Sequence, residues 1–211
     1  MMSLRQALDA APLIAILRGL LPENAVDTAA VLVEAGFRVI EVPLNSPDPF
    51  DSIARIADRF SDVAVVGAGT VLSAQDVAAV QDAGGRIVVA PNMNTAVGQA
   101  AVDRDLDWCP GVFTPSEAFA ALDLGASVLK FFPAEIVPPT AIGAMRAVLP
   151  RTAIVAAVGG IVPEKMSPYW DKGADAFGLG SALFKPDYAL EDVRARAQGF
   201  MDAVSHLKAR S

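Results

Sequence analysis

A regular alternation of short apolar runs with longer amphipathic stretches is the feature of this chain that most constrains its fold. Eight such runs, rich in β-branched and aliphatic residues, begin 20 to 26 residues apart along the 211-residue chain. Runs that are apolar almost throughout are typical of strands in a parallel sheet whose outer face is covered. The predicted strands cover residues 13–18, 38–44, 63–70, 87–91, 107–112, 127–133, 153–160 and 176–183.

The amphipathic stretches between these runs carry the end signals of helices. Pro22 opens the first of them and Gly36 closes it, which is the usual placement of proline and glycine. Ser73 is predicted to cap the N-terminus of a second helix. Thr114 is predicted to cap a third, with Glu117 at the position that completes a capping box.

Eight strand–helix units of about 23 residues predict a compact (β/α)8 barrel of the TIM type. We expect a short extra helix over residues 3–10 that closes the bottom of the barrel, and a final helix over roughly 188–208. The length favours a single domain covering 1–211. A doubly wound open sheet is the alternative, but no G-x-G-x-x-G opens the first helix, and the G-x-G at 67–69 lacks the third glycine.

The composition sets limits on the function. With 53% hydrophobic and 19% charged residues, the chain is predicted to fold. Its longest apolar runs fall far short of the roughly 18 residues of a membrane-spanning helix, so no membrane partner is expected. The first residues lack the pattern of a secretory signal peptide, which favours a cytoplasmic location. A net charge of −7 argues against a nucleic-acid partner, which needs a basic surface.

The chain has one cysteine, Cys109, and one histidine, His206. An intramolecular disulfide, a cysteine-rich zinc site and a multi-histidine zinc site are therefore excluded. We expect no metal and no cofactor. Cys109 and its neighbour Trp108 are predicted to lie in the core, and His206 is predicted to be a solvated residue near the end of the last helix.

Three charged residues stand in or at the end of predicted strands: Arg18, Glu41 and Lys130. Burying an unpaired charge costs several kcal/mol, so such residues need a reason to be there. In a barrel of this kind, the residues that carry chemistry lie at the carboxyl ends of the strands. We therefore expect the three side chains to meet in the barrel mouth. The alternative is a buried ion network that only ties the strands together.

The types of these residues suit chemistry on a 2-keto acid. A lysine in an apolar pocket beside an arginine should have a lowered pKa, because the ammonium form is disfavoured. The neutral amine of Lys130 can attack a ketone and form a Schiff base. Glu41 is placed to move protons, and Arg18 can bind a carboxylate through two hydrogen bonds.

Glycines mark the ends of the last two predicted strands. Gly159 and Gly160 end the seventh, and the eighth contains Gly180 followed by Ser181. The loops after strands 7 and 8 of a barrel commonly bind phosphate through backbone N–H groups. We predict a phosphate site here, with tight turns as the alternative reading. Thr70, at the end of the third strand, is a candidate donor to a carboxylate.

Several of these segments, in this order, resemble the 2-keto-3-deoxy-6-phosphogluconate and -galactonate (KDPG/KDPGal) aldolases, which are class I, Schiff-base lyases. The resemblance covers essentially the whole chain. It rests on P-L-I-A-I-L-R-G at 12–19, V-I-E-V-P-L-N-S-P at 39–47, G-A-G-T-V-L at 67–72, P-G-V-F-T-P-S-E-A at 110–118, L-K-F-F-P-A-E at 129–135 and A-V-G-G at 157–160. The resemblance implies a (β/α)8 barrel, a homotrimer and no need for a metal or organic cofactor.

The resemblance also implies roles for individual residues. Lys130 matches the Schiff-base lysine and Glu41 the general acid/base. The other matches are contacts to the substrate: Arg18 and Thr70 to the pyruvate carboxylate, Gly159, Gly160 and Ser181 on the phosphate side, and Pro91 and Phe132 around the lysine.

Two segments distinguish the epimer classes of this family. Gluconate-type members commonly carry T-L-R-T after the second-strand glutamate and P-T-G-G at strand 7. This chain has P-L-N-S at 43–46 and A-V-G-G at 157–160, so Asn45 and Val158 resemble the galactonate type. The segment F-F-P-A-E at 131–135 resembles the gluconate type instead.

The expected reaction is cleavage of 2-dehydro-3-deoxy-6-phospho-D-galactonate to pyruvate and D-glyceraldehyde 3-phosphate. The first alternative is the same chemistry on the 6-phosphogluconate epimer, or on both epimers. Alternatives of other classes are a phosphate-binding barrel isomerase, a non-catalytic phosphosugar-binding protein and a metal-dependent aldolase with carboxylate ligands.

Overall fold

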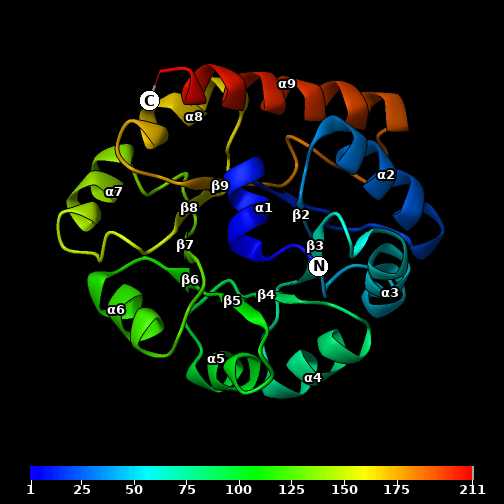
Figure 1. Cartoon of the computed structure of the whole chain (residues 1–211), viewed down its shortest axis with the longest axis horizontal. Coiled ribbons are helices and arrows are strands. Elements are labelled where there is room, and N and C mark those ends of the chain that lie inside the picture. The colour runs from blue at the N-terminus through cyan, green and yellow to red at the C-terminus, as the bar shows by residue number, and fades with distance from the viewer. Residues whose placement is uncertain (211) are drawn as a thin grey trace.

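A ring of parallel strands surrounded by helices forms the protein in the computed structural model, which describes residues 1–210 (Figure 1). The end of the predicted domain, Ser211, lies outside the described residues. All neighbouring strands pair in parallel, in the order β5-β4-β3-β2-β1-β9-β8-β7-β6. The strands are β1 (Leu13–Ile16), β2 (Val39–Pro43), β3 (Val65–Gly69), β4 (Ile87–Val89), β5 (Asp107–Cys109), β6 (Gly111–Val112), β7 (Leu129–Phe131), β8 (Val155–Val158) and β9 (Ala176–Leu179).

The barrel closes through the single segment that was predicted as the fifth strand. Pro110 divides it into β5, which pairs with β4, and β6, which pairs with β7. Proline has no N–H to donate, so it interrupts a ladder. Its carbonyl still accepts a hydrogen bond from the Lys130 N–H at 3.0 Å. The described residues therefore form nine strands, of which β5 and β6 together take the place of the predicted fifth strand. The predicted (β/α)8 barrel is confirmed.

Helices follow the strands around the outside of the ring, except α1, which precedes β1 and lies over one end of the barrel. They are α1 (Leu4–Ala10), the short 3-10 helix η1 (Pro22–Asn24), α2 (Ala25–Ala35), α3 (Pro49–Phe60), α4 (Ala74–Asp82), α5 (Thr95–Val102), α6 (Pro115–Asp123), α7 (Pro139–Arg146), α8 (Pro163–Trp170) and α9 (Leu190–Lys208). Both predicted caps are confirmed, because Ser73 and Thr114 each accept from the third backbone N–H of their helix. Gly36 ends α2 at φ 113°, a conformation that glycine adopts easily.

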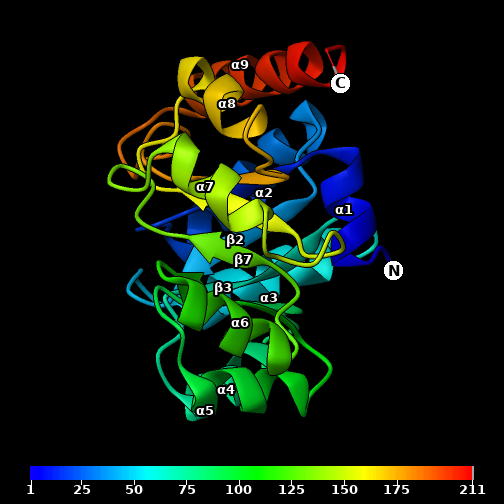
Figure 2. The ribbon, with the colours of Figure 1, turned by 90° about the vertical axis from the view of Figure 1, so that its left-hand side faces the viewer.

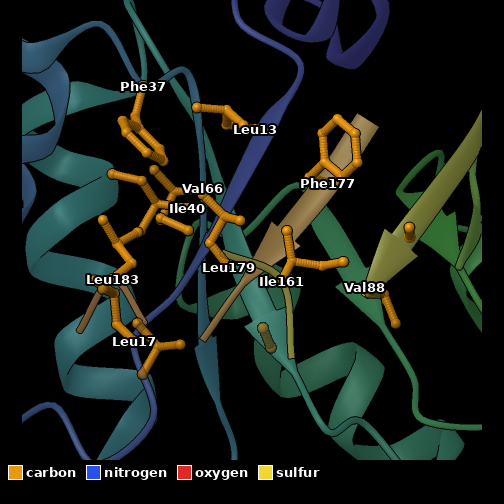
Figure 3. Packing of buried hydrophobic residues seen from close by; sticks show 14 of the residues in the cluster. Leu13, Leu17, Phe37, Ile40, Val66, Val88, Ile161, Phe177, Leu179 and Leu183 are labelled. Atoms are coloured by element: carbon orange, nitrogen blue, oxygen red, sulfur yellow. The ribbon is translucent and has the colours of Figure 1, made fainter. Parts of the chain in front are cut away.

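Side chains alternate between two apolar layers along each strand. Leu13, Ile40 and Val66 point outward into the layer between the strands and the helices. Figure 3 shows part of this layer, where Ile40 and its register partner Val66 lie beside Phe37. The alternate residues fill the barrel interior together with α1, from which Leu4, Ala7 and Leu8 contribute. Figure 2 shows α1 at one end of the barrel, as predicted for a helix that closes the bottom.

This alternation decides where the charged residues point. Glu41 follows the outward Ile40 in β2, and Lys130 stands between the outward Leu129 and Phe131 in β7, so both face the interior. Seven of the eight predicted strands were too long at their carboxyl ends. In particular, Arg18 lies beyond the end of β1, so the prediction that it sits within a strand is wrong.

Candidate active site

A cleft of about 650 Å³ opens at the carboxyl ends of the strands, and all eleven predicted site residues line it. The strands supply Glu41, Lys130 and Val158, and the segments that follow the strands supply Arg18, Thr70, Pro91, Phe132, Gly159, Gly160, Gly180 and Ser181. Residues far apart in the sequence are thus brought to one place by the closure of the barrel.

Lys130 lies at the floor of the cleft with 8% of its surface exposed. Burial lowers its pKa, because a buried ammonium loses its hydration. The charge of Glu41 acts in the opposite direction, and the nearby Arg18 adds to the lowering. The Lys130 Nζ lies 5.0 Å from the centroid of the Phe132 ring. The direction of this pKa shift agrees with the prediction, which named the apolar surroundings and the neighbouring arginine as its causes, and burial is the larger of the two.

Glu41 is 2% exposed, and burial raises its pKa, partly offset by the charges of Lys130 and Arg18. Within residues 1–210 its Oε2 accepts no hydrogen bond. Gly69 in β3 makes room for this carboxylate, since a Cβ at that position would lie 2.6 Å from Oε1. A buried carboxyl group with a free oxygen and a raised pKa is suited to moving protons.

Arg18 was predicted to be a buried charge, and the structure does not confirm this. It is exposed, because it follows β1 and reaches over the rim of the barrel. Its guanidinium donates to the Asn45 side-chain oxygen and lies 3.5 Å from the Thr70 hydroxyl. The exposed position leaves its remaining N–H groups free to bind an anion in the cleft.

Thr70 has a left-handed backbone, with φ 56°. A β-branched residue rarely adopts this conformation, and strain of this kind gathers at functional sites. The turn brings Thr70 out of β3 and beside Arg18, consistent with the predicted carboxylate site.

Gly159 and Gly160 face a neighbour that the sequence did not reveal. Both have positive φ, at 113° and 61°. A Cβ at Gly159 would lie 2.3 Å from Glu135 Oε2, and one at Gly160 would lie 3.1 Å from Glu135 Oε1. The two glycines therefore make room for the Glu135 carboxylate as well as bringing backbone into the cleft.

The segment after β9 adds groups that sequence reasoning also missed. The β9–α9 loop, residues 180–189, forms one wall of the cleft, with Lys185 and Tyr188 beside Ser181. Arg196 reaches the same wall from α9. Ser181 was predicted in a strand, but β9 ends at Leu179 and Ser181 lies in a turn.

The remaining chemically notable residues lie elsewhere. Cys109 is a free, buried cysteine facing the barrel interior, and Trp108 is buried in the outer layer, as predicted. His206 is exposed on α9. Residues 1–210 contain no cluster of three or more His, Cys, Asp or Glu side chains arranged for a metal ion. Across the same residues, no helix has the length and apolar character needed to cross a membrane.

A family model described as KDPG and KHG aldolase matches residues 4–196. The chain belongs to this family. Its (β/α)8 barrel is therefore that of a carbon–carbon lyase.

Relatives and a solved structure agree with this assignment. A probable 2-dehydro-3-deoxy-6-phosphogalactonate aldolase of Rhizobium meliloti (strain 1021) is 50% identical over 186 residues, covering 88% of both chains. The 2-dehydro-3-deoxy-6-phosphogalactonate aldolase of Escherichia coli (strain K12) is 42% identical, covering 91% of this chain and 94% of the relative. A solved structure described as native KDPGal is 40% identical with a TM-score of 0.92, over 94% and 96% of the two chains.

Proposed function

We propose that the protein cleaves 2-dehydro-3-deoxy-6-phospho-D-galactonate to pyruvate and D-glyceraldehyde 3-phosphate through a Schiff base on Lys130. The observation that carries the proposal is the pairing of a buried lysine and a buried glutamate, both facing one open cleft. The family and the names of the two relatives support the substrate class. No step needs a metal or an organic cofactor.

The first half of the reaction forms the Schiff base. The neutral amine of Lys130 adds to the C2 ketone, and its lowered pKa raises the fraction of this form. Glu41 donates a proton to the C2 hydroxyl, which leaves as water and gives an iminium. Arg18 and Thr70 hold the substrate carboxylate at the rim, where the two side chains lie together.

The second half breaks the carbon–carbon bond. Glu41, now ionised, takes the proton of the C4 hydroxyl. The C3–C4 electron pair moves toward the iminium, which yields an enamine and releases the aldehyde. Protonation at C3 and addition of water to the iminium then release pyruvate and restore the free amine of Lys130. Burial favours a protonated Glu41 before the first proton transfer and after the last.

Two residues support the galactonate epimer. Val158 ends β8 in the cleft wall and offers no hydroxyl to the C4 oxygen. Asn45 stands where T-L-R-T of the gluconate type has an arginine, and it accepts a hydrogen bond from the Arg18 guanidinium. A site that relied on a hydroxyl at position 158 would lose about 1–3 kcal/mol of discrimination without it. The gluconate epimer is the second candidate, favoured by F-F-P-A-E at 131–135.

The test is pyruvate release from the two C4-epimeric 6-phospho sugar acids, measured side by side with coupled lactate dehydrogenase in EDTA. We expect faster cleavage of the galactonate epimer. Equal rates would contradict the selectivity assigned to Val158 and Asn45 while keeping the chemistry. Absence of pyruvate from both epimers would overturn the lyase proposal.

We also propose a cytoplasmic homotrimer that acts on small molecules, without nucleic-acid or membrane partners. The family resemblance supports the trimer, and the net charge of −7 argues against a nucleic-acid surface. The one cysteine is free and buried, which suits a protein that needs no disulfide.

A further inference from the structure

We propose that Lys185 and Arg196 bind the phosphate of the substrate at the β9–α9 wall of the cleft, and that Tyr188 positions both cations. The inference rests on the proposed function, because it assigns one end of that substrate. The ligand chemistry is a phosphomonoester dianion. Neither cation is part of a sequence motif: Lys185 lies in the loop, and Arg196 is in the second turn of α9.

Both cations stack on the ring of Tyr188. The central guanidinium carbon of Arg196 is 4.3 Å from the ring centroid, and the Lys185 Nζ is 5.5 Å from it. Stacking of cations on an aromatic ring restricts their motion without using their hydrogen-bond donors. Both cations therefore keep donors for an anion, and both line the cleft beside Ser181.

Hydrogen bonds attach this group to the turn that carries Ser181. An Arg196 N–H donates to the Ala182 carbonyl at 3.2 Å, and the Tyr188 Oη lies 3.5 Å from the Ser181 carbonyl oxygen. In the described part of the chain, the backbone N–H groups of Ser181 and Ala182 donate to no other group. The wall thus combines two cations, a hydroxyl and two free backbone donors, which is a suitable set for phosphate.

A carboxylate in the same cleft explains why cations are needed. The Glu135 carboxylate lies against Gly159 and Gly160, the loop predicted to receive the phosphate. A phosphate held by that loop alone would face a like charge at short range. Apart from Lys130 and Arg18 at the pyruvate end, the cations that line this cleft are Lys185 and Arg196, which follow the neighbouring strand β9. Their positive charge offsets Glu135 and holds the phosphate near Ser181.

The test compares a phosphorylated substrate with its unphosphorylated analogue. The enzyme is assayed for pyruvate release from 2-dehydro-3-deoxy-6-phospho-D-galactonate and from 2-dehydro-3-deoxy-D-galactonate. For Arg196→Gln and for Lys185→Gln, we expect the ratio of the two kcat/KM values to fall about ten- to hundredfold, because each variant removes a charged hydrogen-bond donor to phosphate. Competitive inhibition by inorganic phosphate should weaken in the same variants.

Matched controls exist on the same surface. Arg194→Gln removes the same charge from the same helix, but Arg194 pairs with Glu34 at 2.8 Å and does not line the cleft. Its ratio should equal that of the wild-type enzyme. Tyr188→Leu removes the ring on which both cations stack and should lower the ratio, whereas Tyr188→Phe keeps the ring and should retain most of the wild-type ratio.

Two outcomes would overturn the inference. One is an equal loss of kcat/KM on both substrates, which would make the cations structural. The other is a ratio of the two kcat/KM values in Lys185→Gln and Arg196→Gln that equals the ratio in Arg194→Gln. Borohydride trapping of pyruvate on the wild-type enzyme tests the proposed function separately, since pyruvate carries no phosphate. If pyruvate is trapped but the ratio of kcat/KM values is unchanged in Lys185→Gln and Arg196→Gln, only this inference is contradicted. If no pyruvate is trapped, the proposed function is contradicted.

Discussion

Burial changes the protonation of the two charged residues at the cleft floor in opposite directions. It lowers the pKa of Lys130 and raises the pKa of Glu41, because each charged form loses its hydration. Each charge also favours the other charged form, so the two groups titrate as a pair. The pair can therefore offer a neutral amine and a protonated acid nearer to neutral pH than the isolated side chains would.

The pH dependence of imine formation follows from the sign of the Lys130 shift. The neutral amine is the reactive form, so the rate should fall as the pH falls through the Lys130 pKa. Because burial lowers that pKa, the fall should lie at a lower pH than for a free lysine. The initial rate of imine formation with pyruvate, measured across pH, checks this. A midpoint in the range of an exposed lysine amine would contradict it.

Gly69 provides a test of the position of Glu41. In Gly69→Ala, the new Cβ would lie 2.6 Å from Glu41 Oε1, so the carboxylate must move. We expect kcat to fall about tenfold to a hundredfold, less than the roughly 10²–10⁴-fold loss expected for Glu41→Gln. Steady-state kinetics measures both losses. Wild-type kcat in a folded Glu41→Gln protein would exclude Glu41 from the mechanism.

Local sequence patterns predicted the ends of helices better than the ends of strands. The capping residues Ser73 and Thr114 were predicted correctly, because a cap depends on groups within four residues. Strand ends were predicted too late, since the apolar run continues through Thr70 after the ladder stops at Gly69. A strand ends where its pairing with the neighbouring strands stops, and this depends on residues far away in the sequence.

Two helical glycines differ in what surrounds them. A Cβ at Gly98 in α5 would lie 2.5 Å from the Trp108 ring, whereas a Cβ at Gly199 in α9 would meet nothing within 4 Å. Gly98→Ala should lower the free energy of unfolding by about 1–3 kcal/mol through overpacking. Gly199→Ala should raise it by roughly 0.5–1 kcal/mol through helix propensity. Denaturant unfolding checks both, and equal effects would contradict the close packing of α5 on Trp108.

At the scale of the whole molecule, the sequence predicted the barrel and one half of the cleft. The repeat of apolar runs fixes the number of strand–helix units, and a charge inside such a run marks Glu41 and Lys130. Glu135, Lys185 and Arg196 carry no such mark, because charged residues in loops and on helix surfaces are common. Only the closed barrel brings them beside Ser181 and Gly159.

We propose that the chain forms one cooperative unit within a homotrimer. Unfolding followed by tryptophan fluorescence and by far-ultraviolet circular dichroism should give coincident transitions, since one continuous apolar layer links the helices to the barrel. Sedimentation equilibrium should give three times the mass of the chain. A monomer mass, or two separated transitions, would contradict this assembly.

The most direct test of the central claim is to locate the adduct formed with pyruvate and borohydride. The wild-type protein should gain one reduced pyruvate per chain, and peptide mass spectrometry should place it on Lys130. Lys130→Met should fold and gain none, while Lys172→Met, which changes a lysine outside the cleft, should gain one as before. An adduct that persists in Lys130→Met, or that maps to another lysine, would contradict the account.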